Sequence, residues 1–361
     1  MEHPSPDFGR VIATLRHQEP DRVPLAEVAV DYQIMGQFIG RSVTDDDVAA
    51  QTEFWHRAGY DYVILTAGLM RPGGVTRDSQ ISKVIDVALV AERNAGHTVD
   101  DQAWNVWAKA RIHTEDDLEA FPWDTAARMD YRKFHAVQQH LPEGMKIIAA
   151  CGKIFTLSWM LMGFENFAAN VLLQPRFVKR LIERVALIQI DSLREISRIP
   201  NVAAVWAVDD LAFGSGPILS PATFREFLFP WYEEFGHVCR ERGLHFFFHT
   251  DGVFWDVLDD LLHFGVEALH PIDPTCLDIQ EVKRRLRGRL CLIGNVPNRA
   301  LADSSPQEIE ELTRHLLKTV APGGGYCLGS GNSVPDWARI ENYRRMIETT
   351  MRFGRYPIRI D

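Results

Sequence analysis

The sequence predicts an α/β fold: a single (β/α)8 barrel in which parallel strands alternate with helices. The first observation is that short apolar runs alternate with longer amphipathic runs along most of the chain, as in strand–helix–strand units. The second is that several apolar runs end in polar residues, as residues 244–252 (LHFFFHTDG) do. The third is the length of 361 residues, which one such barrel often uses. Because these units make right-handed parallel crossovers, a series of them closes on itself.

Continuous apolar runs bounded by turn residues are typical of strands buried on both faces, as parallel strands are. They predict strands at residues 23–30, 61–66, 146–151, 201–210, 244–252, 266–273, 289–297 and 323–332. The amphipathic runs predict helices at 8–18, 31–40, 44–60, 166–174, 175–197, 220–243, 253–265, 279–288, 305–320 and 341–354. Two of these helices begin with Ser-Pro, at Ser220 and Ser305, because serine caps free N–H groups and proline suits the first turn.

Residues 79–114 interrupt the alternation. They contain β-branched residues, Trp104, Trp107 and turn signals such as NAGH, which predict one or two inserted β-hairpins beside the barrel. The rest of the chain shows no low-complexity segment and no repeat beyond the strand–helix rhythm. We therefore predict one domain over residues 1–361, with an N-terminal helix and this insertion.

Composition and charge argue against several classes of protein. The formal net charge of −10 disfavours general binding to nucleic acid and to acidic membranes. The five cysteines are scattered without a CxxC pair, which is typical of a reduced compartment. The first residues lack a signal-peptide pattern, and no run approaches the roughly 18 apolar residues of a membrane span. We therefore expect a cytoplasmic protein that binds neither nucleic acid nor membrane.

Polar side chains follow the predicted strands at their carboxyl ends. In an α/β barrel the active site lies at this end of the strands. His249 and Asp251 end one strand, and Gly252 allows the sharp exit after them. Asp209 and Asp210 end the preceding strand. Imidazole and carboxylate groups in a partly dry pocket suit acid–base chemistry or a divalent metal. We predict catalytic roles for His249, Asp251, Asp210 and Asp209, with a turn cap as the alternative role for one of the two adjacent aspartates.

A second set of polar and aromatic residues is predicted to bind the substrate at the same edge. The set consists of Glu27, Tyr32, Trp206, His270 and Asn332. Two of its members have structural alternatives. His270 precedes a proline and suits a buried histidine bonded to the backbone, and Trp206 suits the core.

Several segments resemble one known family when they are taken in order. They are PDRVP, GFENFAANVLLQPRFVKRLIERV, DDLAFGSGPILSPATFREFLFPWY, HTDG, LIGNVP, SPQEIEELTRHLL, APGGGYCLGSGN and IENYRRMIE. Over nearly the whole chain they are similar to the uroporphyrinogen decarboxylase superfamily, which includes cobalamin-dependent methyltransferases. The resemblance implies a (β/α)8 barrel, the fold that the strand and helix patterns predict independently.

The N-terminal region separates the branches of this family. The decarboxylases of the family that the chain resembles have an arginine-rich segment of the type MRQAGRYLPE, whose arginines bind the carboxylates of the substrate. The corresponding region here is AEVAVDYQIMGQFIG, and no arginine lies between Arg22 and Arg41. Because an octacarboxylate needs cationic partners, this argues against porphyrinogen decarboxylation.

The methyltransferase branch implies a zinc site. Members that act on thiols bind zinc through an HxC motif and a second cysteine. Here His249 is kept, whereas Asp251 stands at the first cysteine position and Asn332 at the second. Zinc held by His249 and Asp251 would be a harder Lewis acid, better suited to an ether oxygen than to a soft thiol.

The resemblance therefore implies a corrinoid-dependent methyltransferase of the O-demethylase type. It would cleave a small methyl ether, such as a methoxyaromatic compound, and pass the methyl group to cobalamin on a separate corrinoid protein, with zinc as a second cofactor. One alternative is a decarboxylase, for which Arg71, Arg77 and Arg299 are the available loop cations. The other is a non-catalytic binding barrel. The sequence is compatible with a monomer or a homodimer.

Overall fold

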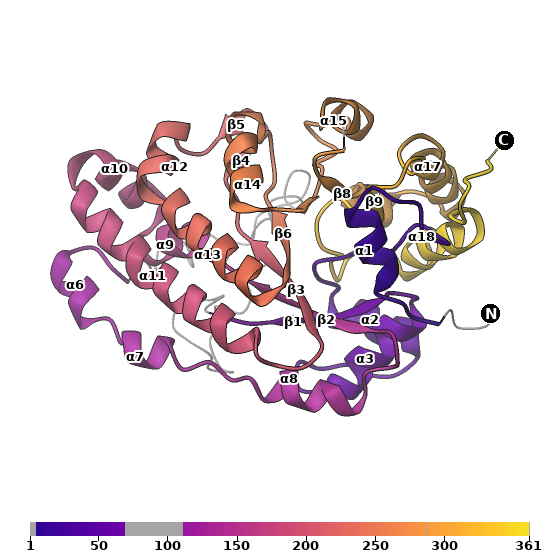
Figure 1. The fold of residues 1–361 in the computed structure, drawn as a ribbon, viewed down its shortest axis with the longest axis horizontal. Coiled ribbons are helices and arrows are strands. Elements are labelled where there is room, and N and C mark those ends of the chain that lie inside the picture. Colours follow the sequence, from indigo (N-terminus) through magenta and orange to yellow (C-terminus); the bar gives the residue numbers. More distant parts are fainter. Residues whose placement is uncertain (1–4, 69–110, 287, 361) are drawn as a thin grey trace.

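The computed structural model describes residues 5–68, 111–286 and 288–360. Its central feature is a parallel seven-stranded sheet that curls into a half-barrel, with helices along its outside (Figure 1). The strands lie in the order β1 (Tyr62–Thr66), β2 (Lys146–Cys151), β3 (Val202–Val208), β6 (His245–His249), β7 (Ala268–His270), β8 (Cys291–Val296) and β9 (Tyr326–Ser330). The predicted α/β class and its barrel-like architecture are confirmed.

The parallel register brings the carboxyl ends of neighbouring strands together. Val208 of β3 pairs with His249 of β6, and His249 pairs with His270 of β7. The short antiparallel hairpin of β4 (Ala212–Phe213) and β5 (Gly216–Pro217), which the sequence pattern did not predict, follows β3 at this edge. The polar residues after these strands therefore emerge side by side.

The first predicted strand, residues 23–30, is an extended segment rather than a full strand. It makes isolated parallel bridges toward the β9 side, between Leu25 and Leu328 and between Val30 and Val334. On the side of β1 a side chain makes the connection. The N–H of Glu27 donates to the phenol oxygen of Tyr62, and this phenol donates to the Glu27 carbonyl, both at 2.7 Å.

Most predicted helices are present. They are α1 (Gly9–Leu15), α2 (Tyr32–Ile39), α3 (Val48–Arg57), α10 (Phe164–Leu173), α11 (Pro175–Ile196), α14 (Leu258–Phe264), α15 (Ile279–Leu286), α17 (Pro306–Thr319) and α18 (Ile340–Phe353). The predicted helix 220–243 is divided into α12 (Pro221–Phe227) and α13 (Phe229–Arg242), because Pro230 in the first turn of α13 has no N–H to continue the helical ladder. The structure adds helices that were not predicted: α6 (Glu115–Ala120), α7 (Trp123–Ala126), α8 (Arg132–Ala136), α9 (Phe155–Met162), α16 (Asn298–Asp303) and the 3₁₀ turn η2 (Val137–Gln139). The predicted helix 253–265 begins with the 3₁₀ turn η3 (Trp255–Val257), which leads into α14.

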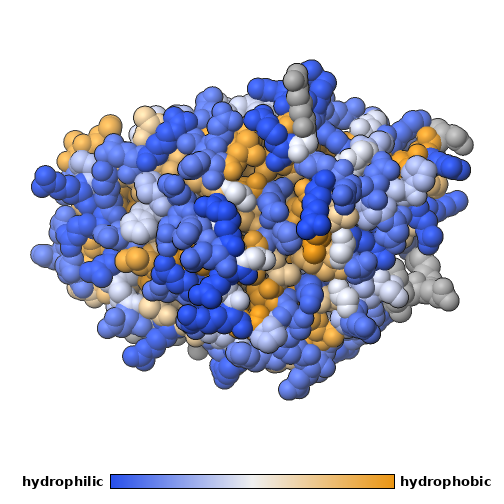
Figure 2. All heavy atoms as spheres, in the orientation of Figure 1, coloured by the Kyte–Doolittle hydropathy of each residue, from blue (hydrophilic) through white to orange (hydrophobic). Residues whose placement is uncertain are grey.

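The strands and the inner faces of the helices share one buried hydrophobic core. Polar residues cover most of the face seen in Figure 2, with hydrophobic residues in patches between them. The predicted hairpins at 79–114 lie outside the described residues, except for residues 111–114, which lead into α6. Among the helices that the structure describes, none is long and apolar enough to span a membrane.

Candidate active site

Three side chains meet at the carboxyl ends of β3 and β6, and we call Asp210, His249 and Asp251 the acid–imidazole cluster. Each offers a potential ligand atom within 4.8 Å of the others. His249 Nε2 lies 3.5 Å from Asp210 Oδ1 and 3.8 Å from Asp251 Oδ1. The N–H of Asp251 donates to Asp210 Oδ1 at 3.3 Å, so the exits of the two neighbouring strands are tied together.

A second histidine supports the cluster from β7. The Nδ1 atoms of His249 and His270 are 2.8 Å apart, so one must donate and the other must accept. His270 is fully buried, and burial, followed by the charge of His249, lowers its pKa well below the ordinary value. A neutral His270 therefore accepts at Nδ1 from the Nδ1–H of His249. This bond fixes the His249 ring with Nε2 toward the carboxylates.

Opposing effects set the charge of the cluster. Burial lowers the pKa of His249, but the hydrogen bond to Asp210 and the charges of Asp251 and Asp210 outweigh burial and raise it above the ordinary value. For Asp210, burial acts to raise the pKa, and the contacts with His249 and the charge of Lys153 reverse this and lower it. In the absence of a metal, these opposite shifts favour a protonated His249 beside an ionised Asp210.

Asn332 orients one of these carboxylates. Its Nδ2 donates to Asp251 Oδ1 at 3.1 Å and to Oδ2 at 2.9 Å. Its Oδ1 accepts from the N–H of Ser333 at 2.8 Å, which leaves the amide only one orientation. Asn332, predicted to bind substrate, thus holds Asp251 in the cluster.

Lys153 belongs to the candidate site, although it was not among the predicted residues. It follows the end of β2 at the same edge, and only 8% of it is exposed. Its positive charge acts on both Asp210 and His249. The signal was available, because a glycine and a lysine directly follow the apolar run 146–151.

Asp209 points away from the cluster, although it precedes Asp210. Its Oδ2 accepts from the N–H groups of Ile154 and Phe155 at 3.0 and 2.6 Å, and its Oδ1 accepts from the N–H of Thr156 at 2.7 Å. The hydroxyl of Tyr232 also donates to Oδ2 at 2.6 Å. These bonds satisfy N–H groups at the start of α9, so Asp209 builds the scaffold beneath the site.

Glu27 is buried below the end of β9. Its Oε1 accepts from the N–H of Ser330 at 2.7 Å, and its Oε2 lies 2.5 Å from Ser330 Oγ. Burial raises the pKa of Glu27 to about 8, although the bonds to Ser330 act in the other direction. Glu27, predicted to bind substrate, therefore contacts the last residue of β9, two residues before Asn332, and is fully enclosed.

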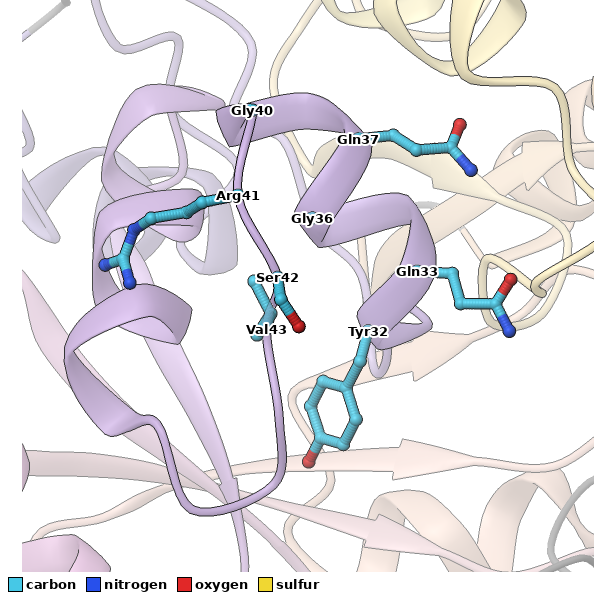
Figure 3. Close-up of a pocket in the computed structure, with 8 residues that line it drawn as sticks. All are labelled: Tyr32, Gln33, Gly36, Gln37, Gly40, Arg41, Ser42 and Val43. Atoms are coloured by element: carbon cyan, nitrogen blue, oxygen red, sulfur yellow. The ribbon is translucent and has the colours of Figure 1, made fainter.

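The two predicted aromatic residues lie in different places. Trp206 is fully buried, and its ring lies edge-on to His270 with the centroids 5.1 Å apart, so it packs against the supporting histidine. Tyr32 starts α2 and donates to Asp45 Oδ1 at 2.8 Å. It lines an open groove of about 450 Å³ along α2 (Figure 3). The groove is lined by Tyr32, Gln33, Gly36, Gln37, Gly40, Arg41, Ser42 and Val43, none of which belongs to the acid–imidazole cluster.

The acid–imidazole cluster fits a metal ion of the zinc type. Around tetrahedral zinc, with bonds of about 2.0–2.1 Å, ligand atoms lie about 3.3 Å apart. The separations of 3.5 and 3.8 Å from His249 Nε2 to the carboxylates are close to this value. The Nδ1–H of His249 already has the outer partner that a zinc-bound histidine needs. Within the described residues, the group that could hold a metal contains no cysteine, so its donors are oxygen and nitrogen.

Comparisons with known proteins place the chain in a family. A family model described as uroporphyrinogen decarboxylase (URO-D) matches residues 8–353. The chain belongs to the URO-D family. The solved structure of a methyltransferase from Methanosarcina mazei covers 97% of this URO-D chain and 99% of its own, with a TM-score of 0.66 and 16% sequence identity, which is a likeness of fold. A 7,8-dihydropteroate synthase from Vibrio fischeri ES114 matches with a TM-score of 0.31 and 13% identity, covering 93% of each chain. No curated protein matches this URO-D chain.

Proposed function

We propose that this URO-D family member is a methyltransferase that cleaves a small methyl ether and passes the methyl group to cob(I)alamin on a corrinoid protein. The observation that carries the proposal is the acid–imidazole cluster, which gathers oxygen and nitrogen donors at the strand edge where barrel enzymes do their chemistry. Family membership and the similar fold of a methyltransferase support the reaction class.

The chemistry of the cluster suits an ether oxygen. An ether gives up its methyl group poorly because the oxygen must leave with the electron pair of the carbon–oxygen bond. Protonation of that oxygen by His249 Nε2 makes it a neutral alcohol or phenol and a better leaving group. Asp210 and Asp251 hold the proton on His249 before the reaction, and Lys153 adds positive charge beside the leaving oxygen.

A bound zinc ion would take the place of the proton on His249 Nε2 and act on the same ether oxygen. Asp210, His249 and Asp251 would supply three ligands and leave a fourth position open, and the ion would supply Lewis acidity there. Cob(I)alamin would supply the electron pair of the new carbon–cobalt bond, so the methyl group moves as a cation. Without zinc the leaving oxygen takes its proton from His249 Nε2, and with zinc it would take a proton from the solvent.

Porphyrinogen decarboxylation has less support in the described residues. Of its three predicted loop cations, Arg299 has 87% of its side chain exposed and pairs with Asp303 on the surface. Arg71 and Arg77 lie outside the described residues.

Methyl transfer to a reduced corrinoid protein tests the proposal directly. The protein is incubated with a panel of methoxyaromatic compounds, and methylcobalamin is followed by absorbance and the released phenol by chromatography. We expect both products in equal amounts, and their loss together with bound zinc in His249→Ala and Asp251→Ala. Ser305→Ala, at the cap of α17, is the matched control that should keep both. No transfer across the panel, or carbon dioxide release from uroporphyrinogen, would contradict the proposal.

A further inference from the structure

Glu27 and the end of β9 form a chain of hydrogen bonds beneath the acid–imidazole cluster. Glu27 Oε2 lies 2.5 Å from Ser330 Oγ, and Ser330 Oγ lies 2.9 Å from the carbonyl oxygen of Asn332. Glu27 and Ser330 are fully buried, and Asn332 is 7% exposed. The contacts are therefore made inside the protein, where each donor and acceptor must be matched.

The number of available hydrogens determines the protonation state of Glu27 in this series of hydrogen bonds. The hydroxyl of Ser330 has one proton, yet it lies between a carboxyl oxygen and a carbonyl oxygen. If Glu27 were ionised, Ser330 could donate to only one of them, and two oxygen lone pairs would face each other at the other contact. If Glu27 carries a proton, it donates to Ser330 Oγ, and Ser330 donates to the Asn332 carbonyl. Only the protonated acid gives every oxygen a matched partner.

The surroundings of Glu27 favour the same state. The ionisable groups that face it in the described residues are the phenols of Tyr62 on β1, Tyr60 just before β1, and Tyr343 on α18. Burial raises the pKa of each of these phenols well above its ordinary value, so all three are neutral. Within the described part of the chain Glu27 has no ion-pair partner. A carboxylate there would be buried without a compensating charge, which is costly.

We propose that Glu27 is a protonated acid at neutral pH that fixes the end of β9 and, through Ser330 and Asn332, positions Asp251 for the acid–imidazole cluster. Glu27 touches neither the cluster nor the space beside it, so it is a positioning residue. Its effect passes from the hydroxyl of Ser330 to the backbone of Asn332, and from the amide of Asn332 to both oxygens of Asp251. The inference extends the proposed function, but the proton on Glu27 and the position of Asp251 can be measured without any methyl transfer.

The conservative variant is Glu27→Gln. Its amide oxygen can accept from the N–H of Ser330, and its NH₂ can donate to Ser330 Oγ, so it copies the protonated acid and not the carboxylate. Glu27→Leu removes both bonds, and Asn332→Ala removes the last link alone. If Glu27→Leu fails to fold, Ser330→Ala breaks the chain at its centre and serves in its place.

Two measurements on the full-length protein, after chelation of bound metal, test the proposal. Infrared spectroscopy should show the carbonyl band of a protonated carboxylic acid at pH 7 in the wild type, and this band should be missing in Glu27→Gln. NMR titration of the His249 ring, assigned with His249→Ala, should give a pKa above about 6.5 in the wild type. Glu27→Gln should keep that value, whereas Glu27→Leu and Asn332→Ala should lower it, because Asp251 no longer faces the ring.

The outcomes separate this inference from the proposed function. No acid band at pH 7, or a His249 pKa that is lower in Glu27→Gln than in the wild type, would overturn the inference. An unchanged His249 pKa in either Glu27→Leu or Asn332→Ala would also overturn it. A protein that transfers no methyl group from any ether would contradict the proposed function. That result would not change what the infrared and NMR measurements say about Glu27.

Discussion

Asp209 and Asp210 are adjacent, yet they have opposite surroundings. Asp209 is buried against the start of α9, where three backbone N–H groups and the hydroxyl of Tyr232 donate to it. Asp210 faces His249 on the open side of the strand ends, with about a third of its side chain exposed. Consecutive residues of an extended chain point to opposite sides, so one aspartate supports the fold and the other faces the chemistry. A carboxylate whose oxygens already accept from fixed protein donors is not available to bind a substrate.

Asp210→Asn should give the largest effect in this comparison. The amide keeps the shape but removes the negative charge that raises the pKa of His249, so His249 loses its proton more readily. We expect methyl transfer to fall by about 10²- to 10⁴-fold, the usual loss when acid–base assistance is removed. The free energy of unfolding, measured with urea, should change little. A rate near that of the wild type would show that Asp210 does not act on the reaction.

Asp209→Asn should reverse this pattern and lower stability instead. One oxygen of the side chain becomes an NH₂ group. In either orientation this NH₂ faces a backbone N–H that donates to the carboxylate in the wild type. Each donor left without an acceptor costs about 1–3 kcal/mol, so we expect a loss of about 3 kcal/mol in the free energy of unfolding. Methyl transfer per folded molecule should stay near the wild-type rate. A stable but inactive Asp209→Asn would place Asp209 in the chemistry after all.

The fold was largely predictable because a continuous apolar run bounded by turn residues, such as the one in β6, is typical of a strand covered on both faces. The segment 23–30 has the same apolar character, and the pattern cannot reveal that the phenol of Tyr62 takes the place of a strand ladder there. The hairpin of β4 and β5 has only two residues in each strand, which is too short for any periodicity.

The candidate site was predictable where strand order alone decides it. Asp210, His249 and Asp251 follow strands that are neighbours in the sheet, so a list of strand ends already contains them. The list could not separate Asp209 from Asp210, because the donors to Asp209 come from a helix start more than fifty residues earlier in the chain. The burial of Glu27 was not predictable either, because it depends on how the segment 23–30 packs against β9.

Asn332→Ala should have an intermediate effect on the cluster. The cluster residues all stay, but Asp251 loses the two bonds from the amide that hold it toward His249. Loss of such an outer partner usually costs about 10- to 100-fold in metal affinity or activity, and we expect a drop of that size in zinc affinity, measured by competition with a chelator. Asn298→Ala, which removes a bond from another asparagine to the Ser333 carbonyl nearby, is the matched control. Equal losses in the two variants would mean that the whole loop, and not the bond to Asp251, matters.

The smallest effect should be a pH dependence of stability that comes from His249. Its pKa is raised in the folded protein above the unfolded value of about 6.5, so the folded state binds the proton more tightly. The stabilisation is therefore complete below about pH 6.5 and is lost as pH rises through the folded pKa, with a slope of at most about 1.4 kcal/mol per pH unit. Glu27, whose pKa of about 8 lies above its unfolded value, weakens the fold with rising pH in an overlapping range, so both proteins compared should carry Glu27→Gln. In that background, and after chelation of bound metal, urea unfolding between pH 6 and 9 should show the slope with His249 present and lose it with His249→Gln. In Asp210→Asn the stabilisation should be lost at a lower pH, because the charge that holds the proton on His249 at high pH is gone.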